Sequence, residues 1–151
     1  MIEEITLPEQ KTKTARQILE ALTEWFELEA GREAFIAESA EQPFLAAKEN
    51  GNYIGFLTLK ETGKATVELA VMGVLPEYHR KGIGRQLVEA AKTLARRQGY
   101  QFMQVKTVQS GVYESYDRTN LFYQNCGFQE LEVFPLLWDE NNPCQVYVMA
   151  L

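Results

Sequence analysis

Apolar residues recur at helical spacing in several stretches of the chain. Residues 15–26 place apolar side chains on one face and polar ones on the other, which predicts an amphipathic helix. A shorter helix is expected after Gly31, and a strong one from Ile83 to near Gly99, where a glycine favours a helix end. The stretch "SYDRTNLFYQNC", residues 115–126, predicts a short helix.

Strand patterns fill most of the remaining chain. "IEEITL" reads as a short strand, and residues 43–75 read as three strands joined by tight turns at Asn50-Gly51-Asn52 and Thr62-Gly63-Lys64. "FMQVKTV", "GFQELEVF" and "CQVYVMAL" supply three more. The order β-α-α-β-β-β-α-β-α-β-β predicts an α/β fold (α+β, mixed sheet) with a largely antiparallel N-terminal half. No repeat or linker is present, so we expect a single domain over residues 1–151.

Composition narrows the classes of function. The chain has a net charge of −6 and 46% hydrophobic residues, which is typical of a soluble globular protein and disfavours nucleic acid as a partner. The N-terminus has no signal-peptide pattern, and no apolar run is long enough to cross a membrane. Cys126 and Cys144 are too few for a redox or metal motif, so we expect no metal, reduced thiols and a cytoplasmic location.

A small basic segment stands out in this acidic chain. In "VLPEYHRKGIGRQLVEAA", residues 74–91, a strand leads through a loop into a helix that begins near Gly82. The first turn of a helix has amides without partners and a partial positive charge. Glycines at 82 and 84 leave those amides accessible, and the nearby side chains of His79, Arg80, Lys81 and Arg85 add positive charge. The pattern favours a phosphate or pyrophosphate site. A glycine-containing turn with solvated basic residues is the simpler alternative.

Two common phosphate-binding motifs are excluded. The P-loop needs G-x-x-x-x-G-K-[ST], which the sequence lacks. The dinucleotide-binding turn needs a third glycine, and Leu87 occupies that position. The strands before the loop are also joined as hairpins rather than through helices.

The same segment resembles the coenzyme A-binding motif of the GNAT acyltransferases, R/Q-x-x-G-x-G/A, which lies between the fourth strand and the third helix. "TNLFYQNCGF" resembles a second family motif, and "YDRTNLFYQNCGF" with "FPLLWDENNPC" is similar to a little-characterised bacterial GNAT group. The resemblance covers nearly the whole chain in element order. It implies that acetyl-CoA is the cosubstrate and that the loop amides hold its pyrophosphate. The residues expected to bind it are Met72, Gly73, Val74, His79, Arg80, Lys81, Gly82, Ile83, Gly84, Arg85 and Asn120.

The sequence departs from the family pattern at two positions. His79 stands where Arg or Gln is usual, and Arg80 is a substitute for that contact. Tyr116 stands where many members have Asn, and Asn120 lies nearby on the same predicted helix.

The resemblance also implies catalytic residues. Tyr123 aligns with the tyrosine that the family often uses as a general acid towards the CoA sulfur. Without the resemblance, Tyr123 reads as one more core aromatic. Side chains alternate between the two faces of a strand, so Glu68 points to the opposite face from Val67 and Leu69 and is the candidate general base. A strand residue that merely faces solvent fits the same pattern. Glu114, Asp117 and a water relay are rivals for the base.

These features together predict an acetyl-CoA-dependent N-acetyltransferase that acts on a primary amine of a small molecule or protein by direct attack in a ternary complex. A non-catalytic acyl-CoA sensor and a partner-binding module with the same fold are the alternatives. The single histidine disfavours Ser-His-Asp and Cys-His catalysis. The family's behaviour allows a homodimer formed through the C-terminal strand. The acceptor, and whether the acyl group is always acetyl, stay open.

Overall fold

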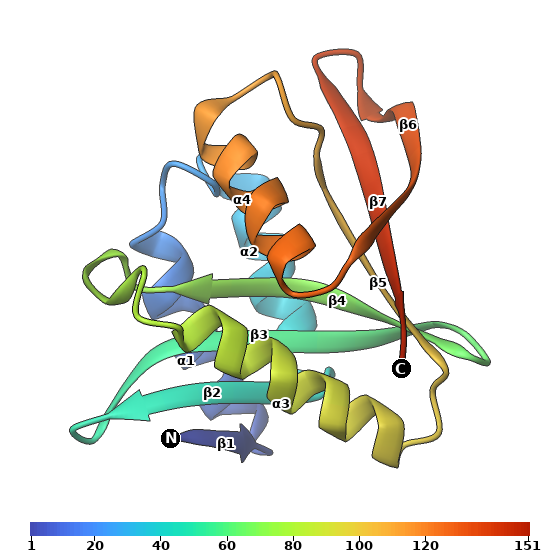
Figure 1. Ribbon diagram of the computed structural model, residues 1–151. Coiled ribbons are helices and arrows are strands. Elements are labelled where there is room, and N and C mark those ends of the chain that lie inside the picture. The colour runs from blue at the N-terminus through green and yellow to red at the C-terminus, as the bar shows by residue number, and fades with distance from the viewer. The chain divides into compact units, whose positions relative to one another are not determined.

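The computed structural model describes residues 1–151. The helices and strands follow the predicted order, with one added turn of 3₁₀ helix (Figure 1). Their bounds are β1 Ile2–Ile5, α1 Pro8–Glu20, α2 Glu29–Ser39, β2 Phe44–Glu49, β3 Asn52–Gly63, β4 Thr66–Val74, η1 Pro76–Tyr78, α3 Ile83–Arg97, β5 Phe102–Val108, α4 Glu114–Asn125, β6 Gln129–Asp139 and β7 Asn142–Ala150.

The strands form one mixed seven-stranded sheet in the order β1-β2-β3-β4-β5-β7-β6, which confirms the predicted α/β class. β1 pairs antiparallel with β2, and β2 with β3, as expected for the N-terminal half. β4 and β5 are parallel, and their pairing covers Thr66–Leu69 against Phe102–Val105. β4 continues beyond this pairing to Val74.

The chain divides into two compact units, residues 1–60 with 70–94 and residues 61–69 with 95–151. The single domain expected over residues 1–151 remains a prediction. The first unit is built on a core that α1, α2 and the strands share, in which the rings of Phe44 and Phe56 stack at 5.1 Å. Figure 1 shows α1 and α2 on one face of these strands and α3 on the other.

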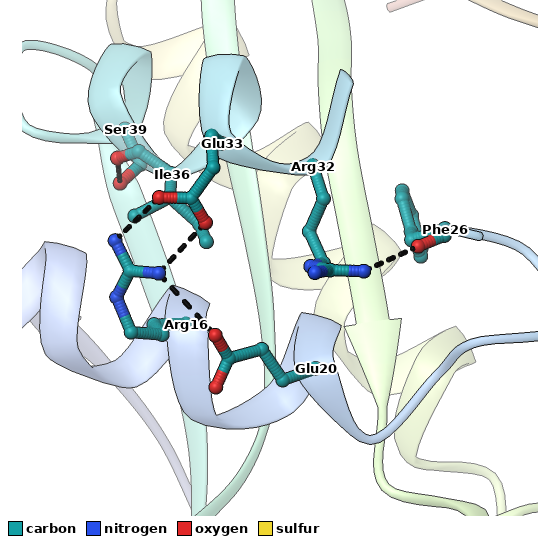
Figure 2. Close-up of polar contacts among 7 residues, drawn as sticks. All are labelled: Arg16, Glu20, Phe26, Arg32, Glu33, Ile36 and Ser39. Atoms are coloured by element: carbon teal, nitrogen blue, oxygen red, sulfur yellow. Dashed lines mark hydrogen bonds and ion pairs between the residues drawn. The ribbon is translucent and has the colours of Figure 1, made fainter. Parts of the chain in front are cut away.

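An ion pair joins the two N-terminal helices of the first unit. Arg16 of α1 donates two hydrogen bonds to the Glu33 carboxylate of α2, at 2.7 and 2.9 Å, and a third to Glu20 at 3.3 Å (Figure 2). Arg32 donates to the carbonyl of Phe26 at 3.0 Å and so ties α2 to the segment before it. The pair is exposed, so its two-pronged geometry matters more for the orientation of the helices than for stability.

The predicted extent of the first helix was wrong. α1 begins at Pro8, where proline suits a first helical position, and ends at Glu20 rather than near Phe26. Residues 22–26 form tight turns, in which the amides of Trp25 and Phe26 bond to the Leu22 carbonyl. Leu22 is buried and the two aromatic side chains pack on the core. Because turn residues can fill a core as helical ones do, the apolar spacing could not reveal the helix end.

Three other boundaries also differ from the prediction. α2 begins at Glu29 and contains Gly31, since an acidic residue suits the first turn of a helix. The second hairpin turns at residues 64–65, one step later than expected, because β3 extends through Gly63. β6 runs to Asp139, beyond the predicted strand end at Phe134, because Asp139 pairs with Asn142 of β7.

Two glycines allow the helices of the first unit to approach the sheet closely. A β-carbon on Gly73 of β4 would lie 2.7 Å from Leu22 Cδ1 and 3.1 Å from Ile18 Cγ2. A β-carbon on Gly55 of β3 would lie 3.2 Å from the Gly73 carbonyl oxygen and 3.3 Å from Leu87 Cδ1 of α3. β4 therefore contacts α1 and the turn that follows it at Gly73, and β3 contacts α3 at Gly55.

We expect Gly73→Ala to lower the free energy of unfolding by about 1–3 kcal/mol, because the added methyl group overpacks the contact with Leu22 and with Ile18 of α1. Gly31→Ala is the matched control, since no atom lies within 4 Å of its β-carbon and the residue is helical. That change should raise stability by about 0.5–1 kcal/mol. Urea unfolding followed by circular dichroism measures both. A Gly73→Ala protein as stable as wild type would show that α1 does not depend on this close approach.

Candidate functional site

The basic loop, residues 75–82, follows the C-terminal end of β4 in the first unit. Met72 and Val74 are half-buried, and Gly73 is buried against α1. The Leu75 amide bonds to the Ile54 carbonyl at 2.8 Å and so anchors the chain where the strand ends. The 3₁₀ turn Pro76–Tyr78 then leads into residues 79–82. The start of the loop is thus fixed by main-chain contacts to β3.

The main chain of the loop has an unusual conformation at two positions. Arg80 has φ 62° and Gly82 has φ 79°, both in the left-handed region. A left-handed residue other than glycine is uncommon and is often found at functional sites. A β-carbon on Gly82 would meet no atom within 4 Å, so this glycine serves backbone conformation and open space rather than packing. Left-handed residues that alternate with residues of negative φ can turn successive amides towards a common point, which suits an anion.

The loop runs directly into the N-terminus of α3. The Gln86 amide bonds back to the Gly82 carbonyl at 3.0 Å, as in the first turn of a helix. The amides of Ile83 and Gly84 precede this bond, where an α-helix supplies no acceptor of its own. The helix dipole places positive potential at the same end. Backbone amides and the dipole together form a site that favours a phosphate or pyrophosphate group.

Cationic residues lie just before this helix N-terminus and in its first turn. Arg80, Lys81 and Arg85 are exposed, and the Lys81 ammonium lies 5.3 Å from the centre of the Tyr78 ring. Long cationic side chains in water add attraction for an anion without fixing its position. Three of the four side chains predicted to add positive charge are thus exposed at the start of α3.

His79 faces the protein. Its Nε2 lies 2.6 Å from the Val74 carbonyl oxygen, and its ring meets that of Trp25 edge-on at 5.8 Å. Since a carbonyl only accepts, the Nε2 atom carries the proton in this contact. His79 therefore links the loop to the end of β4, a role that its charge alone did not predict.

In the second unit, Tyr123 lies on α4 among aromatic rings. It is 7% exposed, and its ring lies 5.6 Å from Phe128 and 6.2 Å from Tyr147. Burial raises the pKa of the Tyr123 hydroxyl above its ordinary value, with smaller contributions from Cys126 and Tyr116. The phenol therefore stays protonated well into the alkaline range, which a proton donor requires.

Glu68 is held by a cation that the sequence analysis missed. Its carboxylate accepts a hydrogen bond from the Lys106 ammonium of β5 at 2.5 Å, and the Glu68 side chain is 8% exposed against 28% for Lys106. The alternation of "FMQVKTV" places Lys106 on the polar face of its strand, but no pattern in the sequence pairs it with Glu68. The strand residues Val67 and Leu69 are buried as expected, and Glu68 is buried as well.

Cys144 lies within electrostatic range of this ion pair. It is fully buried on β7, and burial raises the pKa of its thiol, opposed by Lys106 and reinforced by Glu68. A neutral buried thiol is a poor nucleophile. The other cysteine, Cys126, is also buried, as expected for a small apolar side chain.

Asn120 takes part in a buried hydrogen-bond network. Its amide nitrogen donates to the carbonyls of Val108 and Tyr116 at 2.8 and 2.7 Å, and its oxygen accepts from the Tyr147 hydroxyl at 2.6 Å. Tyr147 also accepts from the Gln124 side chain at 3.1 Å. Sequence reasoning missed Tyr147, because nothing local distinguishes it from the other apolar residues of "CQVYVMAL".

The rivals for the general base lie at the start of α4. Glu114 is exposed and pairs with Arg118 at 3.8 Å, and Asp117 accepts a hydrogen bond from the Gly111 amide at 2.7 Å. Asp117 thus holds the loop before α4, whereas Glu114 reaches into water.

None of the helices is long and apolar enough to pass through a membrane.

Comparisons with known proteins identify the family of the chain. The sequence model of the acetyltransferase (GNAT) family matches residues 11–128. A curated relative, an uncharacterised N-acetyltransferase of Chlorobaculum tepidum, is 30% identical over 104 residues, which cover 67% of this chain and 61% of the relative. The match therefore spans less than two thirds of that relative's length.

Solved structures share the fold over almost the full chain. A GNAT-family acetyltransferase structure from Desulfovibrio desulfuricans aligns with a TM-score of 0.85 at 17% identity, over 99% of this chain and 98% of that one. A GNAT acetyltransferase from Elizabethkingia anophelis, with acetyl-CoA bound, aligns with a TM-score of 0.73 at 17% identity, over 100% and 97%. At these identities the likeness is one of fold.

The buried tyrosines of the second unit predict a dependence of stability on pH. Burial raises the pKa of Tyr123, and also those of Tyr116 and Tyr147, above the value of 10. A raised pKa in the folded state means that the stability is complete below about pH 10 and is lost as the pH rises further. We expect the free energy of unfolding in urea to fall between pH 9 and pH 11, and to fall less in Tyr123→Phe. Equal falls in both proteins would contradict a strongly raised pKa at Tyr123.

Proposed function

Because the chain belongs to the acetyltransferase (GNAT) family, we propose that it transfers the acetyl group of acetyl-CoA to a primary amine of a small molecule or a protein. The acceptor attacks directly, in a ternary complex. The proposal includes a cytoplasmic location and a homodimer formed through the C-terminal strand.

The observation that carries the proposal is the backbone of the basic loop. Left-handed residues at Arg80 and Gly82 precede a helix whose first amides have no helical acceptor, and Gly82 leaves open space beside them. We assign the amides of residues 80–85 to the pyrophosphate of acetyl-CoA, with Arg80, Lys81 and Arg85 as surrounding cations. Main-chain groups of Met72, Gly73 and Val74, on the part of β4 beyond its pairing with β5, are assigned to the pantetheine arm.

His79 and Asn120 receive supporting roles. The His79 ring is engaged by the Val74 carbonyl and Trp25, so we assign it to holding the loop in position. A direct contact between Asn120 and the cofactor stays a prediction. Asn120 is 1% exposed and its amide nitrogen already has two carbonyl partners, which favours a positioning role within α4.

In the proposed reaction the neutral amine attacks the thioester carbonyl carbon, and the carbon–sulfur bond breaks as the tetrahedral intermediate collapses. Tyr123 donates a proton to the departing thiolate, because its phenol carries a proton at neutral pH. Glu68 takes the proton that the amine nitrogen loses, and Glu114, Asp117 or water remain rivals for that role. A covalent acetyl-enzyme on Cys144 is disfavoured because burial keeps its thiol neutral.

One observation favours the alternative, an acyl-CoA-binding domain without turnover. The Glu68 carboxylate is engaged by Lys106, as expected of a carboxylate whose role is structural. Under this alternative the loop binds the cofactor in the same way and no amine is acetylated.

Gly82→Glu tests cofactor binding. Added charge and bulk at the loop should weaken binding of acetyl-CoA and CoA by tenfold or more, which corresponds to about 1.4 kcal/mol. Gly51→Glu is the matched control, because Gly51 has φ 81° against 79° for Gly82 and equally open surroundings, but lies in the β2–β3 turn. Thermal shift titrated with acetyl-CoA, CoA and ATP measures binding. Equal loss in both variants, or no response of wild type, would overturn the assignment of the loop.

Tyr123→Phe tests catalysis. Loss of the proton donor should lower kcat about 10²-fold and leave the KM for acetyl-CoA within about twofold, because general acid catalysis typically contributes about 10²–10⁴-fold. Thiol release across a panel of amines measures the rate, with Tyr100→Phe as a control that loses a hydroxyl bonded to Glu61 at 2.8 Å. An unchanged kcat would remove Tyr123 from the mechanism. Binding of acetyl-CoA without turnover of any amine would support the alternative.

A further inference from the structure

The hydroxyl of Tyr147 lies between two successive turns of α4. It donates to Asn120 at 2.6 Å and accepts from Gln124 at 3.1 Å, and these residues are four apart in the helix. Side chains four apart lie on the same face of a helix. A single phenol of β7 therefore holds one face of α4 at two points, and Tyr123 lies between those points in the sequence.

Asn120 extends this anchor to a second strand. Its amide nitrogen bonds to the carbonyl of Val108, the last residue of β5, and to the carbonyl of Tyr116 within the helix. Asn120 and Tyr147 are each 1% exposed, so water cannot replace a lost bond without rearrangement. Hydrogen bonds thus fix both the rotation of α4 and its position along its axis against β5 and β7.

Ring contacts alone do not restrict Tyr123 in this way. Phe128 and Tyr147 lie against its ring at 5.6 and 6.2 Å. Aromatic pairs are favourable over centroid distances of about 4.5–7 Å, so these contacts remain favourable after a small shift of the helix. Hydrogen bonds of 2.6–2.8 Å do not tolerate them. The helix position is therefore set by the polar network, and the Tyr123 hydroxyl follows from it.

We propose that Tyr147 and Asn120 are positioning residues that hold α4 in the register in which Tyr123 acts as the proton donor. This inference rests on the proposed function of Tyr123. Displacement of a catalytic group by about 1 Å can lower a rate about 10²-fold. Tyr147 therefore acts on the reaction through Tyr123 and needs no contact with either substrate.

Tyr147→Phe removes the hydroxyl and keeps the ring. Hydrogen exchange gives a test that needs no activity: α4 amides should exchange at least several-fold faster in the variant, whereas those of α3 change little. Tyr100→Phe is the control, because its hydroxyl bonds to an exposed carboxylate outside the network. Unchanged exchange in α4 would overturn the anchoring role.

A double-mutant cycle tests the link to Tyr123. In the wild-type background Tyr147→Phe should lower kcat about five- to tenfold with the KM for acetyl-CoA within twofold. In the Tyr123→Phe background the same change should lower kcat less than twofold, since the group that it positions is absent. Equal loss in both backgrounds would show a general structural effect and overturn the inference.

The two proposals fail in different ways. If wild type releases no thiol with any amine, the proposed function is lost and the catalytic part of this inference falls with it. If wild type is active and Tyr147→Phe has full kcat despite faster exchange in α4, the proposed function stands and the positioning role is wrong.

Discussion

The arrangement of the first unit depends on the close approach of its helices to two glycines, Gly55 of β3 and Gly73 of β4. A β-carbon at Gly55 would press on the Gly73 carbonyl and on Leu87 of α3. A β-carbon at Gly73 would press on Leu22 and on Ile18 of α1. α3 can therefore lie against the strands within its second turn. Its N-terminus, and the loop that enters it, are set by this packing. An anion site made of backbone amides needs such a support. Main-chain donors cannot be redirected by rotation about side-chain bonds if the loop is displaced.

The second unit fixes its candidate catalytic groups by different means. Tyr123 is placed by a helix that buried side-chain hydrogen bonds hold, and Glu68 is held by an ammonium group of a neighbouring strand. Buried polar contacts are directional and costly to leave unmade, so they specify one arrangement more sharply than apolar packing does. The proposed binding function thus rests on main-chain geometry, and the proposed chemistry on side-chain networks.

Much of the fold could be predicted because the signals are local. The sequence predicted a turn at Asn50-Gly51 and a helix end near Gly99, and the structure has left-handed residues at both places. The end of α1 could not be predicted, since Leu22 in a turn fills the core as a helical residue does. Contacts between distant residues were also out of reach. Lys106 lies 38 positions from Glu68, and Tyr147 lies 27 from Asn120, and no periodicity encodes either pair.

The ion pair of Glu68 with Lys106 bears on whether Glu68 can act as a base. A carboxylate that takes up a proton loses the charge that holds the ammonium group, so proton transfer and the ion pair are coupled. The cost depends on what then solvates Lys106. Its side chain is 28% exposed while that of Glu68 is 8% exposed, so water can reach the ammonium group when its partner is neutral. A fully buried lysine would be left with an uncompensated charge, a cost of several kcal/mol. The unequal exposure of the two side chains is therefore compatible with the proposed role of Glu68 as the base.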